Sequence, residues 1–192
     1  MVNGLHVTPK SLVGHWIGPR SLNPARTAML VVAGSLLVAL LAQLSVRLPF
    51  TPVPVTGQTL GVLLVGGALG ANLGALSILL YLAEGAIGLP VLASASHGLP
   101  VGPTGGYLLG FVLMALVVGW FNERGWGRRW GRSLAAMAAG ELVLFAFALP
   151  WLGFYVGFSH VLALGLLPFI PGEAFKLSLA AAALPTAWRI AR

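Results

Sequence analysis

Glu173 and Lys176 are two charged residues inside an apolar stretch near the end of the chain. Their spacing of three places both side chains on one face of a helix. Ionisable residues within such stretches are costly and commonly mark a binding site or a transport pathway. A carboxylate accepts hydrogen bonds and an ammonium group donates them, so the pair can bind a polar ligand. The alternative is that the two charges only neutralise each other.

Further polar and aromatic residues are expected on the same side of the membrane as this pair. They lie around the ends of the predicted helices and are Gln58, Ser94, Ser96, His97, Thr104, Tyr107, Trp151, Phe154, Tyr155 and His160. Apolar walls with a few polar groups are typical of a small-molecule pocket. We therefore predict a substrate-binding site formed by Glu173, Lys176, Gln58, Tyr107, Thr104, His97, Trp151, Tyr155 and Glu84.

Some of these candidates have a second explanation. Trp151 and Tyr155 can equally serve as interfacial anchors, because amphipathic rings collect at the membrane surface. Glu84 can face either the pocket or only the interface. His97 and His160 are expected to be polar loop residues, since a chain without Cys or Asp has few other metal ligands. No metal ligand and no catalytic residue is predicted.

The elements that must position these residues follow from the composition. The 192 residues include 11 Lys+Arg and 4 Asp+Glu, so that 8% are charged and 58% are hydrophobic. Soluble domains carry about 25% charged residues, and a soluble chain of this length cannot bury so much apolar surface. The composition therefore predicts an integral membrane protein. The net charge of +7 fits basic cytoplasmic loops better than nucleic-acid binding.

The apolar stretches predict an all-α integral membrane protein, a compact bundle of six transmembrane helices. The expected helices cover residues 25–46, 58–69, 72–87, 107–121, 133–152 and 171 to just before 189. Proline- and glycine-rich segments separate them on the outer side, at residues 49–56, 88–106 and 153–171. Irregular backbone at a membrane must be buried in protein or line a cavity, so these outer loops are expected to cover the ligand pocket.

The basic residues predict the orientation of the chain. Nine of the 11 fall on the inner side if the N-terminus is cytoplasmic: Lys10, Arg20, Arg26, Arg124, Arg128, Arg129, Arg132, Arg189 and Arg192. Arg47 is the only one in an outer loop, and Lys176 lies within the last helix. Residues 1–24 are predicted to be a cytoplasmic tail and residues 25–192 the membrane domain. Both termini are expected in the cytoplasm, with the chain in a bacterial inner membrane.

Two further polar or small-residue features have open interpretations. Glu141 lies nearer the inner half of its helix and is expected to pair with a basic loop residue or to lie against a partner helix. Ser35, Ala39 and residues 180–183 form small-residue faces. Such faces permit close helix packing, either with a partner subunit or within the chain.

Four motifs resemble those of the BioY family. They are TPVPVTGQTL from Thr51, GLPVLA from Gly88, GPTGGYLLGF from Gly102 and PFIPGEAFK from Pro168. BioY proteins are the substrate-binding (S) components of biotin transporters of the energy-coupling factor (ECF) type. The resemblance covers residues 25–190 and implies a six-helix membrane protein that binds biotin from the outside. The family's last helix commonly shows Asp three residues before a Lys, where this chain has Glu173.

The resemblance also implies partners. A BioY protein usually works with a transmembrane coupling subunit and two ATPase subunits, so no cofactor is expected in this chain and ATP is used by the partners. Which end of biotin meets Lys176 stays open. One alternative is an S component for another vitamin, such as thiamine or riboflavin. A further alternative is an intramembrane enzyme with Glu173 and His97 or His160 as acid and base, although no nucleophile motif or carboxylate pair is evident.

Overall fold

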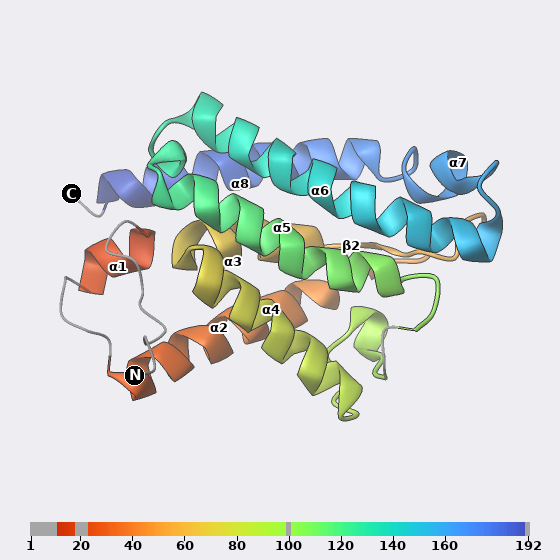
Figure 1. Cartoon of the computed structure of the whole chain (residues 1–192), viewed down its shortest axis with the longest axis horizontal. Coiled ribbons are helices and arrows are strands. Elements are labelled where there is room, and N and C mark those ends of the chain that lie inside the picture. The colour runs from red at the N-terminus through yellow and green to blue at the C-terminus, as the bar shows by residue number, and fades with distance from the viewer. Residues whose placement is uncertain (1–10, 18–22, 99–100, 191–192) are drawn as a thin grey trace.

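The computed structural model describes residues 11–17, 23–98 and 101–190. Within these ranges the chain is helical apart from one two-stranded hairpin, which confirms the predicted all-helical class (Figure 1). Six long helices form the body of the molecule: α2 (Pro24–Ala42), α3 (Gln58–Leu69), α4 (Ala71–Ala86), α5 (Gly105–Glu123), α6 (Trp130–Val156) and α8 (Ile170–Ile190). Parts of the predicted N-terminal tail, residues 1–10 and 18–22, lie outside the described residues.

Three of these helices, α2, α5 and α6, are long and apolar enough to cross a membrane. The helices α3 and α4 are apolar but shorter, with 12 and 16 residues, and they meet at Gly70. The helix α8 has 21 residues and includes the charged pair Glu173 and Lys176. The length and composition of these helices indicate a membrane protein.

Helix α5 lies at the centre of the bundle, where it packs against α3, α4 and α6. Small residues allow this close packing. A Cβ atom added to Gly119 would meet the backbone of Gly70 and Ala71, and one added to Gly74 would lie 2.9 Å from the Cα atom of Gly66. At the same junction the Glu123 carboxylate accepts a hydrogen bond of 2.9 Å from the amide of Ala71. The N-terminus of α4 is thereby capped by the end of α5.

The two ends of the bundle differ in their connectors. One end holds the antiparallel hairpin of β1 (Ser45–Val46) and β2 (Val55–Thr56), the 3-10 turn η1 (Ala93–Ala95) and the short helix α7 (Val161–Gly165). The other end holds the short helix α1 (Leu12–Ile17), the turn η2 (Trp126–Arg128) and the end of α8 (Figure 1). The first of these ends positions the site described below.

The outer connector predicted over residues 153–171 is shorter than expected. Helix α6 continues through Pro150 to Val156, and α7 occupies residues 161–165 within the segment. A proline lacks only its own amide donor, so the residues after it can still donate within the helix. The amide of Gly157 closes the last turn with a bond of 2.9 Å to the carbonyl of Gly153.

Candidate functional site

A cavity of about 440 Å³ lies at the hairpin end of the bundle. Its walls come from the 47–56 segment, η1 and the helices α3, α5, α6 and α8. Ligand sites of drug-sized molecules have volumes of about 300–1,000 Å³, so this cavity is large enough for a small molecule. Most of its walls are apolar, and a few polar side chains interrupt them.

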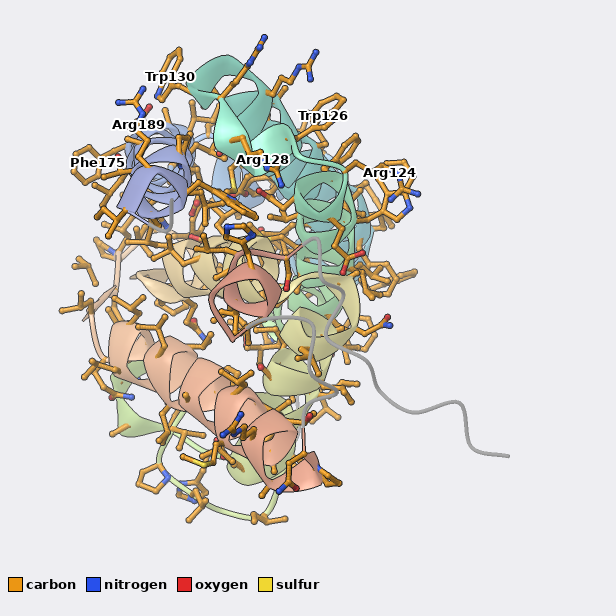
Figure 2. All side chains as sticks on the ribbon, turned by 90° about the vertical axis from the view of Figure 1, so that its left-hand side faces the viewer. Arg124, Trp126, Arg128, Trp130, Phe175 and Arg189 are labelled. Carbon is orange, nitrogen blue, oxygen red and sulfur yellow. The ribbon has the colours of Figure 1, made fainter. Side chains whose placement is uncertain are left out.

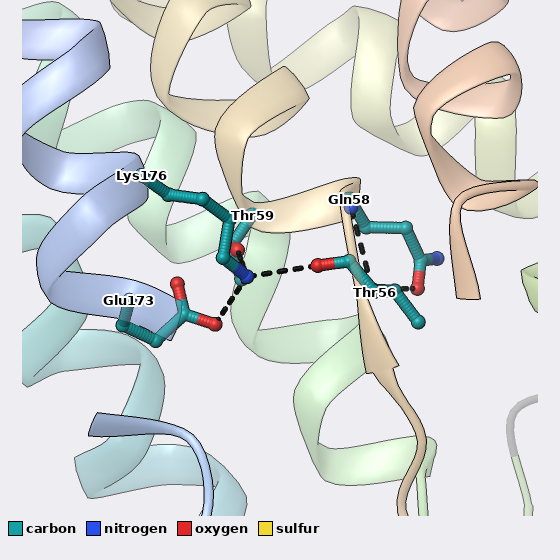
Figure 3. Close-up of polar contacts among 5 residues, drawn as sticks. All are labelled: Thr56, Gln58, Thr59, Glu173 and Lys176. Atoms are coloured by element: carbon teal, nitrogen blue, oxygen red, sulfur yellow. Dashed lines mark hydrogen bonds and ion pairs between the residues drawn. The ribbon is translucent and has the colours of Figure 1, made fainter. Parts of the chain in front are cut away.

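The ammonium group of Lys176 joins three elements beside this cavity. Its Nζ atom lies 2.5 Å from Oε1 of Glu173, 2.6 Å from Oγ1 of Thr59 and 2.8 Å from the carbonyl oxygen of Thr56 (Figure 3). A lysine ammonium has three donors, and these contacts use all of them. Lys176 is only 8% exposed. It therefore links α8 to α3 and β2 and holds the Glu173 carboxylate in place.

Glu173 lines the cavity and is itself buried. Its second oxygen, Oε2, has no hydrogen-bond donor among the described residues. On the neighbouring helix α6, the side chain of Glu141 is also buried and lies close enough to Glu173 to interact with it electrostatically. Neither oxygen of Glu141 has a hydrogen-bond donor in the part of the chain that the structure describes. The prediction that Glu141 pairs with a basic loop residue is therefore wrong among the described residues, because the packing of α6 against α8 places it beside the site.

Gln58 begins α3 and is fixed by two neighbours. Its Nε2 atom donates to the hydroxyl of Tyr81 at 2.6 Å, and its Oε1 atom accepts from the hydroxyl of Thr56 at 2.9 Å. Tyr81 is completely buried on α4. Because both ends of the amide are held, its orientation is defined, and one N–H of Gln58 remains for a ligand.

Aromatic rings form another part of the cavity wall. Tyr107, Phe145 and Phe169 line it, and the ring centroids of Phe145 and Phe169 lie 6.2 and 6.0 Å from that of Tyr107. The hydroxyl of Tyr107 donates to the carbonyl of Gly165 at 2.6 Å, which ties α5 to α7. Phe111, from the next turn of α5, also lines the cavity. This wall suits an apolar ring or chain.

The structure brings five of the nine predicted site residues together. Four of them line the cavity: Glu173, Gln58, Tyr107 and Thr104. The fifth, Lys176, does not line it but bonds to Glu173 at its wall.

Trp151 and Tyr155 do not line the cavity. The indole N–H of Trp151 donates to the carbonyl of Gly102 at 3.0 Å, and the hydroxyl of Tyr155 donates to the carbonyl of Val101. Both bonds hold the segment before α5 against the end of α6. These residues therefore position a cavity-forming connector, because their polar groups are directed to its backbone.

His97 and Glu84 also lie outside the cavity lining. His97 is exposed in the connector after η1. Glu84 of α4 accepts a hydrogen bond of 2.5 Å from the hydroxyl of Ser35 on α2. The completely buried Ser35 and the nearby Ala39 pack inside the chain, which favours the intramolecular explanation of that small-residue face.

Other lining residues were not predicted from the sequence. Arg47 lies at the cavity as its cationic residue, whereas its position in the sequence suggested only the end of a helix. Phe145 is in an apolar stretch that offers no distinguishing pattern, whereas Phe169 belongs to the motif that begins at Pro168. For Arg47, the one available signal was that no other basic residue falls in an outer loop.

The bundle and its mostly apolar cavity define a helical membrane protein with a site for a small molecule. The sequence profile of the BioY family matches residues 13–192. The chain belongs to the BioY family.

Individual relatives agree with this assignment. The chain is 39% identical over 157 residues to "Biotin transporter BioY" of Rhizobium etli, covering 77% of this chain and 84% of the relative. It is 36% identical over 155 residues to "Biotin transporter BioY" of Thermotoga maritima, covering 79% and 90%. A crystal structure of the S-component for biotin from an ECF-type ABC transporter has the same fold, with a TM-score of 0.79 and 24% identity over 88% of this chain and 95% of that chain.

Proposed function

We propose that this chain is the biotin-binding S component of an ECF-type transporter. It binds biotin in the cavity from the outer face and delivers it across the membrane together with a coupling subunit and two ATPase subunits. The transporter names of the relatives and the fold of the biotin S-component support this function. The observation that carries it is the buried Glu173 carboxylate, held by Lys176 in the wall of an otherwise largely apolar cavity.

The arrangement of polar groups supports one orientation of biotin. Its ureido ring has two N–H donors and a carbonyl, and Glu173 offers a carboxylate while Gln58 offers an N–H. The three donors of Lys176 already have protein partners, so we assign it to holding Glu173. The ring therefore lies at Glu173 and Gln58 in the proposed complex.

The remaining parts of biotin match the rest of the cavity. Its thioether ring and valeryl chain are apolar, and the rings of Phe111, Phe145 and Phe169 form an apolar wall. Its carboxylate tail would meet Arg47, which is exposed and lines the cavity. A guanidinium group binds a carboxylate through charge-assisted hydrogen bonds.

The distribution of charge supports the orientation in the membrane. Arg124, Arg128 and Arg189 lie at the end of the bundle with α1 and η2, away from the cavity (Figure 2). Basic residues collect on the cytoplasmic side, so this end is assigned to the cytoplasm and the cavity to the outside. With six spanning helices, both termini are then cytoplasmic, in a bacterial inner membrane.

Two of the alternatives, thiamine binding and an intramembrane enzyme, are disfavoured by the cavity lining. Thiamine is a cation, and Arg47 at the cavity would repel it. An intramembrane enzyme would need a histidine near Glu173, but neither His97 nor His160 lines the cavity. Riboflavin offers a set of hydrogen-bond donors and acceptors similar to that of biotin, so its binding must be measured beside that of biotin.

A binding assay on the purified full-length protein tests the proposal. Calorimetric titration in detergent is expected to show tight binding of biotin and none of thiamine or riboflavin. Glu173→Ala is expected to weaken biotin binding at least tenfold, because the ureido donors lose a charged acceptor worth about 1.5–3 kcal/mol. As a matched control, Glu84→Ala removes a carboxylate outside the cavity lining and should retain the affinity. Absence of biotin binding, or equal binding of all three vitamins, contradicts the proposed function.

A further inference from the structure

Four arginines surround a second hollow at the end of the bundle opposite the cavity. The hollow has a volume of about 420 Å³ and is lined by Arg124, Gly125, Arg128, Arg129 and Arg132. These residues extend from the end of α5 through η2 into the first turn of α6. Figure 2 looks onto this end of the molecule and labels Arg124 and Arg128 there. Every charged residue in the lining is a cation.

Two of the four guanidinium groups are held in place by aromatic rings. The Cζ atom of Arg124 lies 3.4 Å from the ring centroid of Trp120, and its Nη1 atom donates to the carbonyl of Trp120 at 3.0 Å. The Cζ atom of Arg128 lies 4.6 Å from the ring centroid of Trp188. Stacking of this kind fixes a guanidinium group while leaving its other N–H donors available. The hollow is thus partly organised before a ligand enters.

No acidic side chain neutralises these arginines within the described part of the chain. The salt bridge there is Lys176–Glu173, which lies beside the cavity at the other end. The nearest acidic residue in sequence, Glu123, accepts a hydrogen bond from the amide of Ala71. Four converging cations repel one another, so a bound anion would stabilise their arrangement.

The start of α6 adds further donors to the same place. Arg129 is its N-cap residue and makes no capping bond through its side chain, and the first turn contains no acidic residue. The first amides of a helix lack partners within the helix, and they carry the positive end of the helix dipole. Phosphate groups bind in such positions.

Tryptophan rings indicate the depth of the hollow in the membrane. Trp120 and Trp130 flank it in sequence, and their side chains are 46% and 55% exposed. Exposed tryptophans of membrane proteins lie at the level of the lipid head groups. Basic pockets between transmembrane helices at this level bind anionic head groups. The general excess of basic residues in cytoplasmic loops explains the number of arginines. It does not require them to stack on tryptophan rings or to surround one hollow.

We propose that the arginine hollow formed by Arg124, Arg128, Arg129 and Arg132 binds a phosphate group, carried by the head group of an anionic lipid. The site is separate from the biotin cavity and does not depend on the proposed transport function. It would order the segment between α5 and α6 at the membrane surface.

Lipid binding to the full-length protein in nanodiscs tests this site. Native mass spectrometry would count phosphatidylglycerol molecules retained by the protein, with phosphatidylcholine as the neutral comparison. The variant Arg129→Gln/Arg132→Gln is expected to weaken phosphatidylglycerol binding by about 25-fold, from roughly a fivefold loss for each arginine. The matched control Arg26→Gln/Arg189→Gln removes two exposed charges outside the hollow and is expected to change binding less than about threefold. Circular dichroism of both variants verifies that they are folded.

A second experiment distinguishes a lipid head group from free phosphate as the ligand of the hollow. Inorganic phosphate is added to the protein in phosphatidylcholine nanodiscs and also used as a competitor of phosphatidylglycerol. Weak binding of inorganic phosphate with no competition supports the lipid head group, whereas efficient competition supports the phosphate site but assigns it to a free anion. Equal losses in the two double variants, or equal retention of phosphatidylcholine and phosphatidylglycerol, overturn the proposal.

Discussion

Glu141 on α6 and Glu173 on α8 form a buried pair of interacting carboxyl groups next to Lys176. Among the described residues, neither oxygen of Glu141 has a hydrogen-bond donor, and nor has Oε2 of Glu173. Two buried carboxyl groups beside a single ammonium are costly in an apolar bundle, so their arrangement depends on the packing of α6 against α8. We therefore expect Glu141 to help position the carboxylate that faces the ligand.

This relationship predicts different effects for two substitutions of Glu141. Glu141→Gln keeps a side chain of the same shape and supplies an amide donor toward Glu173, so it should change biotin affinity less than about threefold. Glu141→Ala removes the side chain beside Glu173 and should weaken biotin binding by about tenfold, equivalent to ~1.4 kcal/mol. Titration calorimetry gives both values. Equal affinities of the wild type and Glu141→Ala would show that Glu141 does not orient Glu173.

The ion pair of Glu173 and Lys176 predicts a non-additive effect on stability. Removing one partner leaves a buried charge, so Glu173→Gln or Lys176→Met should lower the free energy of unfolding by about 3–5 kcal/mol. The double variant should lose less than the sum of the two, because neither charge is then unpaired. Thermal unfolding in detergent measures the three variants. Strict additivity would mean that the pair contributes no coupling.

Trp151 and Tyr155 are predicted to hold a connector and not to contact the ligand. The double substitution Trp151→Phe/Tyr155→Phe removes two hydrogen bonds to residues 101 and 102 while keeping an aromatic ring at each position. Faster hydrogen exchange in residues 101–104 is expected, with biotin affinity within about threefold of the wild type. Trp130→Phe, at the other end of α6, serves as the control. Unchanged exchange would contradict the role of these bonds.

The close contact between α4 and α5 predicts that Gly119→Ala destabilises the bundle. Its added Cβ would meet the backbone of Gly70 and Ala71, which cannot move like the end of a flexible side chain. A loss of about 1–3 kcal/mol is expected in the free energy of unfolding. In Gly131→Ala the added Cβ meets no atom within 4 Å, so this control should be neutral or slightly stabilising. Comparable losses in both variants would exclude the packing explanation.

The proposed orientation can be tested with single cysteines, because the chain has none of its own. His97→Cys lies at the cavity end and Gly131→Cys at the arginine end, both at exposed positions. A membrane-impermeant maleimide should label His97→Cys on intact cells and Gly131→Cys only after lysis. The reverse pattern would place the cavity on the cytoplasmic side.

Much of the architecture could be predicted from the sequence because it depends on local properties. The lengths of the apolar stretches and the prolines between them placed six helices near their observed positions. The spacing of Glu173 and Lys176 within one helix likewise sufficed to place them on one face, where they form an ion pair.

The tertiary structure alone decided which side chains meet at the cavity. Lys176 bonds to Thr56 and Thr59, which are 120 and 117 residues away in the sequence. In helices that are apolar all round, no periodicity marks the face that turns inward, so Glu141 and Phe145 gave no sign of their neighbours. The sequence predicted Trp151 and Tyr155 as binding residues, yet their polar groups donate hydrogen bonds to the backbone of a connector. The rotation and packing of whole helices set these contacts, and both depend on residues distributed over the entire chain.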